Sequence, residues 1–192
     1  MIDSAVTQVA SRLNEFLKRH ANVAYDIVRT SNLSELDGTA VTDTENKVLV
    51  FLVNVEKETL PFNALPARSG GFSRSADSSP SVHLTLSIMV AANFSGRHYP
   101  DALKFLANSV SFFQRNPIFD HSNTPDLESR IDRLVLDIEN LSITDLSNLW
   151  GILGGKYVPS ILYKMRMVTF NARDVISQTP PISASDTAAG PA

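Results

Sequence analysis

The chain has 192 residues, of which 43% are hydrophobic and 19% are charged, and this balance suits a globular domain with one core and excludes wholesale disorder. The formal net charge is −3, so no strong field of either sign favours binding to nucleic acid or to an anionic membrane. Because there is no cysteine, disulfides, iron–sulfur clusters and thiolate zinc sites are excluded.

The first residues lack the basic and apolar regions of an export signal, and no apolar stretch approaches the roughly 20 residues that span a bilayer, so we expect a cytoplasmic protein. The spacing of apolar residues predicts an amphipathic helix over residues 1–20, with Asp3 or Ser4 as its cap. A short strand is predicted over residues 23–28. Residues 47–57 (KVLVFLVNVEK) are rich in β-branched side chains and predict a strand that is central in a sheet.

The middle of the chain begins with a predicted long loop over residues 59–81, which is rich in proline, glycine and serine. Alternating apolar and polar residues then predict a strand over residues 82–94. Pro100 suits the first turn of a helix, which the apolar spacing predicts over residues 99–114. A further strand is predicted over residues 133–140, where the apolar residues alternate.

The last part of the chain predicts a short helix over residues 144–153, capped by Thr144, and a final strand over residues 161–171. Residues 173–192 are rich in proline, serine, threonine and alanine and predict a flexible tail after a domain of residues 1–172. This order of elements predicts an α+β fold, in which a mostly antiparallel sheet is flanked by helices.

Patterns typical of catalysis are missing from the sequence. The glycine-rich residues 151–156 depart from a phosphate-binding loop, because Tyr157 stands where a hydroxyl residue would bind magnesium. The four histidines have no partner at metal-ligand spacing. Asp137 and Glu139 share a strand face, but a solvated face explains them more simply than acid–base chemistry. We therefore predict no enzyme, no catalytic residue, no cofactor and no metal site; a small enzyme with a pocket at loop 59–81 is the least favoured alternative.

One region near the C-terminal end concentrates aromatic and basic side chains. Such residues dominate the energetic centres of protein interfaces, which makes this region a candidate interface. A second interpretation stays open, in which the tryptophan packs beneath its helix and the tyrosines brace the last strand. The candidate interface residues are Trp150, Lys156, Tyr157, Tyr163, Lys164 and Arg166.

Five segments, in order along the chain, resemble the cap or tail-terminator proteins of extracellular contractile injection systems, which are phage-tail-like particles. The most specific motifs of this resemblance are NLWG at residues 148–151 and KYVPS at residues 156–160. The resemblance covers about residues 1–172, as an N-terminal terminator domain. The segments that carry it are residues 1–17, 48–56, 83–94, 99–119 and 141–167.

This resemblance implies a structural protein that forms a ring, expected to be sixfold, on the last layer of the inner tube and the contractile sheath. The sheath protein and the inner tube protein would be its partners, together with further copies of itself. The protein would assemble in the cytoplasm and then be part of the particle. A phage tail-completion or connector protein is the alternative within the same class. The strand at residues 161–171, with the tail after it, is a candidate for strand exchange between neighbours.

Overall fold

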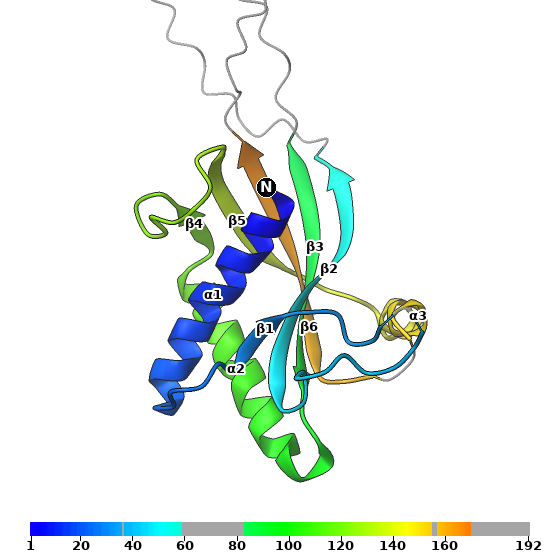
Figure 1. The fold of residues 1–192 in the computed structure, drawn as a ribbon. Coiled ribbons are helices and arrows are strands. Elements are labelled where there is room, and N and C mark those ends of the chain that lie inside the picture. Colours follow the sequence, from blue (N-terminus) through cyan, green and yellow to red (C-terminus); the bar gives the residue numbers. More distant parts are fainter. Residues whose placement is uncertain (36, 59–82, 155–156, 170–192) are drawn as a thin grey trace, which may run out of the picture.

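The computed structural model describes residues 1–35, 37–58, 83–154 and 157–169, and these ranges hold three α-helices, a short 3₁₀ turn and six strands (Figure 1). The α+β class that the sequence predicted is confirmed. The elements are α1 (Ile2–Ala21), β1 (Val28–Thr30), β2 (Lys47–Lys57), β3 (Leu84–Asn93), η1 (Gly96–His98), α2 (Tyr99–Arg115), β4 (Ile118–Asp120), β5 (Ile131–Glu139), α3 (Ile143–Ile152) and β6 (Ser160–Thr169).

The six strands form one mixed sheet in the order β1-β2-β3-β6-β5-β4. Only β1 and β2 run parallel, and the other four neighbouring pairs are antiparallel. The sheet is therefore mostly antiparallel but not purely so. A β-bulge lies between Leu52 and Asn54 of β2, and such a bulge increases the local twist of the strand.

The main core lies between one face of the sheet and the helices α1 and α2. The apolar stripe that the sequence predicted on α1 is buried there, and alternate residues of the central strands meet it because strand side chains point to opposite faces. Residues of this core on the sheet are Val28, Val48, Val50, Leu86, Ile88, Val90, Phe119, Ile131, Leu134, Leu136, Tyr163, Met165 and Met167.

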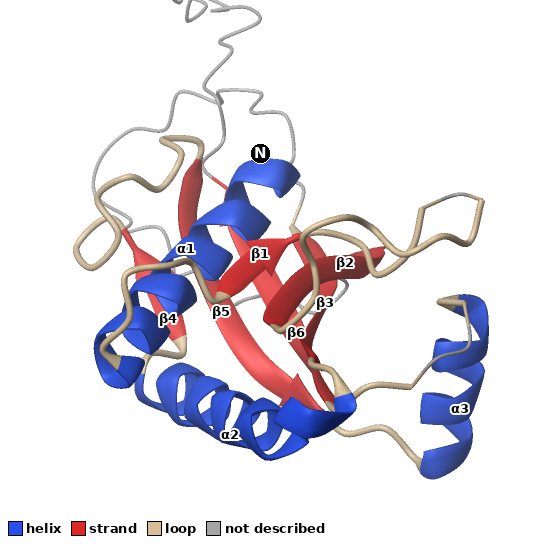
Figure 2. Ribbon diagram, turned by 60° about the horizontal axis from the view of Figure 1, so that its bottom comes forward, coloured by secondary structure: helices blue, strands red, loops and turns tan. Residues whose placement is uncertain are grey.

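A smaller core lies on the opposite face of the sheet, beneath α3. It joins residues of β2, β3 and β6 to Trp150 of α3. Figure 2 shows α3 standing apart from the other two helices. Because both faces are covered at this end of the sheet, the first half of β2 is buried on both sides, as its unbroken apolar sequence predicted. The sheet residues of this smaller core are Leu49, Phe51, Met89, Ala91 and Leu162.

Several details of the predicted elements were wrong. Helix α1 has Met1 at its N-cap position with no side-chain cap, so neither Asp3 nor Ser4 serves as the cap. Helix α3 is capped by Ser142, whose Oγ accepts a hydrogen bond from the Asp145 backbone N–H at 3.1 Å, and not by Thr144. Capping favours Ser142 because it precedes the helix, whereas Thr144 lies in its first turn.

The strand predicted over residues 23–28 begins only at Val28. The side chain of Asn14 on α1 accepts hydrogen bonds from the backbone N–H groups of Ile27 and Val28, at 2.9 and 3.0 Å. These hydrogen bonds attach the start of β1 to helix α1. Strand β4 was not predicted. The predicted loop at 59–81, the tail at 173–192 and the last residues of the predicted strand at 161–171 lie outside the described residues.

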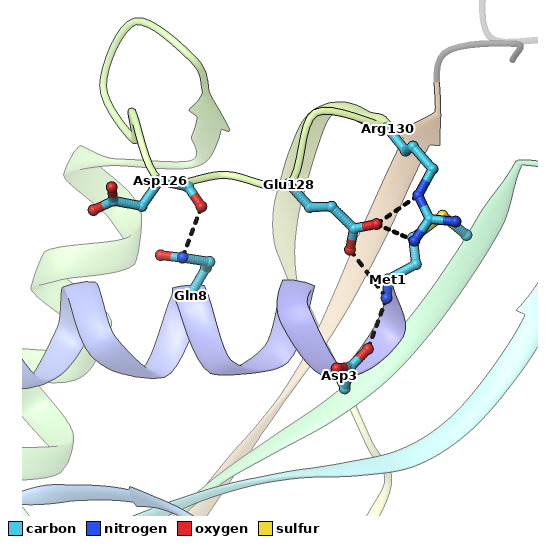
Figure 3. A network of polar contacts seen from close by, with 6 residues as sticks. All are labelled: Met1, Asp3, Gln8, Asp126, Glu128 and Arg130. Carbon is cyan, nitrogen blue, oxygen red and sulfur yellow. Dashed lines mark hydrogen bonds and ion pairs between the residues drawn. The ribbon is translucent and has the colours of Figure 1, made fainter.

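A polar network fastens the start of α1 to the loop between β4 and β5 (Figure 3). The Met1 amine pairs with Asp3 at 2.7 Å and with Glu128 at 3.0 Å, and Glu128 also pairs with Arg130. Hydrogen bonds to Asp3 and Glu128 raise the pKa of the amine above its ordinary 8.0. Hydrogen bonds from that amine, and then from Arg130, lower the pKa of Glu128 below its ordinary 4.5.

Candidate functional site

Helix α3 packs on the sheet through its inner side. Trp150 is 4% exposed, and its ring meets Tyr157 edge-on at 5.6 Å between centroids. Among the described residues the buried indole Nε1 has no hydrogen-bond partner. Leu146, Leu149 and Leu153 are partly buried beside it. The inner side of α3 is thus a small apolar contact with one unsatisfied donor.

Large apolar side chains are also exposed at the two ends of α3, where no part of the described chain covers them, while the outer side between them carries Thr144, Ser147 and Asn148. Ile143 is 87% exposed, Ile152 is 84% exposed and Tyr157, just after the helix, is 59% exposed. We call these three residues the outer patch. Exposed apolar side chains that gather next to an apolar groove mark an interaction site, whereas singly scattered ones are ordinary. The outer patch therefore has the composition of a surface that another protein covers.

A groove of about 430 Å³ lies next to the outer patch, between the end of α3 and the loop that follows β1. Leu52 of β2 lines it and is 36% exposed. Strand β1 pairs only with Val48–Val50 of β2, so no described strand pairs with the outer edge of β2 beyond this point. An apolar groove beside an open strand edge extends the surface that a partner would meet. The other apolar residues that line the groove are Leu33, Phe51, Ile152 and Leu153.

Further along the same face of the sheet, past the small core, lies a strip of charged residues. Lys164 of β6 pairs with Glu139 of β5 at 3.0 Å. Asp137 Oδ1 accepts a hydrogen bond from the backbone N–H of Ile138 at 3.0 Å. These contacts are those of a solvated strand face, and they give Asp137 and Glu139 no arrangement for acid–base catalysis. The charged strip consists of Glu56, Glu58, Asp137, Glu139, Lys164 and Arg166, around a hollow of about 230 Å³.

The structure separates the six residues that the sequence grouped as a candidate interface. Trp150 is buried beneath α3, and Tyr157 belongs to the outer patch. Lys164 and Arg166 lie on the charged strip. Tyr163 points to the other face, where it is 1% exposed and its ring lies 4.8 Å from that of Phe113, so its side chain belongs to the main core.

Lys156 lies outside the described residues, as does the loop at 59–81. Sequence reasoning missed Ile143 and Ile152, the most exposed large apolar side chains of the described chain. The signal that could have found them is the scarcity of charge in α3, where Asp145 is the only charged residue.

Neither a metal site nor a membrane-spanning helix occurs among the described residues. No group of three or more histidine or acidic side chains there is placed to hold a metal ion. No helix in the same residues has the length and apolar character needed to cross a membrane.

Known protein families and solved structures include relatives of this chain. Residues 6–184 match the family described as the Pvc16 N-terminal domain. The chain belongs to the Pvc16 N-terminal domain family. This match confirms the resemblance to tail-terminator proteins that the sequence motifs indicated. No curated protein has a significantly similar sequence.

Two solved structures are similar in fold to this member of the Pvc16 N-terminal domain family. The sheath/tube terminator of an extracellular contractile injection system, in its extended state, is 18% identical over 100% of this chain, with a TM-score of 0.59. The tube-terminating cap of the anti-feeding prophage is 18% identical over 93% of the chain, with a TM-score of 0.49. The chain covers 64% and 60% of these two proteins, which is less than two thirds of each.

Proposed function

We propose that this protein is a structural cap, and not an enzyme, that terminates the sheath and the inner tube of a contractile phage-tail-like injection particle. In this proposal it forms a sixfold ring at the distal end of the particle. Membership of the Pvc16 N-terminal domain family supports this proposal. The observation that carries it is the outer patch together with the adjoining groove, because contiguous exposed apolar surface of this kind marks a protein contact.

The partners in this proposal are the sheath protein, the inner tube protein and further copies of the chain, with no nucleic acid and no membrane. A ring needs two different patches on each subunit, since each copy meets its neighbours head to tail. A cap must also match the last layer of the growing structure. We assign the outer patch to the last layer of the sheath and tube, and the charged strip to the contact between neighbouring copies.

The size of the outer patch bears on how assembly occurs. Three side chains offer at most a few hundred Å², whereas a stable interface covers about 800 Å² on each partner. The isolated chain is therefore expected to be a monomer that assembles when several weak contacts form together on the end of the particle. In this proposal assembly takes place in the cytoplasm before the particle is released. The terminator domain of residues 1–172 and the flexible tail of residues 173–192 stay predictions.

A charge-balanced double variant, Ile143→Asp with Ile152→Lys, tests the outer patch. Both substitutions suit the helix dipole, because the acid is placed at the start of α3 and the base at its end. Both native side chains are largely exposed, so the unfolding temperature should stay close to that of the wild type. In particles imaged by electron microscopy we expect variant-bearing strains to show tubes and sheaths of uncontrolled length.

The matched control is Leu103→Glu on α2, which replaces a 45% exposed aliphatic residue away from the outer patch. This control should leave particle length unchanged. Normal particles from the double variant, with the variant protein present at its usual level, would contradict the assignment of the outer patch.

A further inference from the structure

A second cavity, of about 510 Å³, lies far from α3 along the chain and is built from four separate segments. It opens where the residues before β1, the start of β2, the end of β3 and the start of α2 come together. The capping proposal does not involve this cavity. Its main lining residues are Tyr25, Asp26, Glu45, Phe94, Asp101 and Phe105.

Hydrogen bonds hold the frame of this cavity in place. The backbone N–H of Ser95 donates to Asn46 Oδ1 at 3.2 Å, and the Asn93 side chain donates to the Thr44 carbonyl at 3.0 Å. These two contacts join the end of β3 to the turn before β2. The backbone N–H of Val48 donates to the Ile27 carbonyl at 2.9 Å, which fixes the third side. The cavity is therefore formed before any ligand arrives, as most binding sites are.

Three aromatic side chains form part of the cavity wall, two of which also pack against the main core. Phe94 and Phe105 stack with their ring centroids 5.5 Å apart and their planes 24° from parallel. Tyr25 lines the same cavity and is 66% exposed, so much of its ring is available to a ligand. Flat aromatic faces attract a cation through the ring quadrupole.

The charged groups in the cavity include more acids than bases. Asp26, Glu45 and Asp101 line it together with Lys47, while His98 Nδ1 lies 3.6 Å from Asp101. Two lysines that do not line the cavity reach two of the acids, since Lys18 pairs with Asp26 at 3.0 Å and Lys104 with Asp101 at 3.3 Å. Glu45 has no ion pair within the described part of the chain.

We propose that this cavity binds an arginine side chain presented by another protein. A guanidinium group is flat enough to stack on Tyr25 and the phenylalanine pair, and its fork of N–H donors matches a carboxylate such as that of Glu45. A lysine ammonium group has the charge but lacks the plane and the fork. The ordinary surface pairs of Asp26 and Asp101 with lysine are weak and exposed, so an arginine can displace them at little cost.

This proposal does not depend on the capping role, because its test uses the isolated full-length chain. The probe is N-acetyl-L-arginine methylamide, which mimics an arginine within a peptide, added while backbone amide resonances are followed by NMR. We expect saturable shifts at Tyr25, Glu45, Asn46 and Phe94. The matched citrulline compound has nearly the same shape without the charge and should give no saturable shift.

Two variants locate the site. Glu45→Gln should weaken binding about fivefold, which is the effect of removing one exposed charge pair, and Tyr25→Ala should also weaken it. Glu35→Gln removes an exposed acid elsewhere and should have no effect. Equal binding of the citrulline compound, tighter binding of the matching compound made from lysine, or binding that Glu45→Gln leaves unchanged would each overturn the proposal, as would an absence of binding.

Discussion

Replacing Trp150 by alanine tests how α3 is held on the sheet. Burial of a tryptophan side chain removes about 150–250 Å² from water, which is worth about 4–6 kcal/mol at about 25 cal/mol per Å². Its indole Nε1 is buried without a partner among the described residues, and such a donor costs about 1–3 kcal/mol. The net contribution of the side chain is therefore about 3 kcal/mol, applied mainly to the contact between α3 and the sheet.

Hydrogen–deuterium exchange read by mass spectrometry measures this contribution locally. In Trp150→Ala the amides of α3 should exchange about two orders of magnitude faster, because 3 kcal/mol corresponds to about that ratio. The amides of α1 and of the central strands should keep most of their protection, since they belong to the main core. Trp150→Phe, which keeps much of the aromatic surface and removes the unsatisfied donor, should change exchange less than about tenfold.

Two results would refute this reasoning. An equal loss of protection in α1 and in α3 would mean that the two cores unfold as one unit. A loss in Trp150→Phe as large as that in Trp150→Ala would mean that the indole N–H makes a hydrogen bond that the contacts of the described residues do not include.

Three other changes have expected results. In Glu128→Gln the unfolding temperature should fall most between about pH 4.5 and 8.0, where the Glu128 carboxylate and the Met1 amine are both charged. Because the pKa of Glu128 is lowered and that of the amine is raised in the folded state, their stabilising pair is lost as the pH falls below this window or rises above it. An equal fall at every pH would contradict this. Tyr163→Phe should raise the free energy of unfolding by about 1–3 kcal/mol in denaturant titrations, since the buried hydroxyl has no partner among the described residues and its removal relieves that cost. Gly154→Ala should lower the free energy of unfolding by about 1–2 kcal/mol, because Gly154 has a φ of +100°, which is strained for alanine. Gly151→Ala, within α3, should not lower it.

Strands and helices with long, regular patterns could be predicted from the sequence. Strand β2 has the bounds predicted, because eleven residues of β-branched and apolar character leave little choice of structure. Strand β4 has three residues, too few for any periodicity to show. Its pairing with β5 is fixed by the tertiary fold, which brings Phe119 opposite Leu134.

The candidate site was predictable only in part, because sequence proximity does not decide which face a residue occupies. Tyr163 and Lys164 are neighbours in the chain, yet successive residues of β6 point to opposite faces, so one enters the main core and the other the charged strip. The period of two in a strand could have separated them. The outer patch could not be predicted from the sequence, since only the packing of Trp150 on the sheet shows which residues of α3 face outward.

Deletion of this protein from a producing strain, followed by electron microscopy of the particles, tests the capping role most directly. The account predicts tubes or sheaths of uncontrolled length, or sheaths that slip and contract early, and a return to uniform particles when the wild-type protein is supplied again. Stable particles of normal length in the deletion strain would contradict the account.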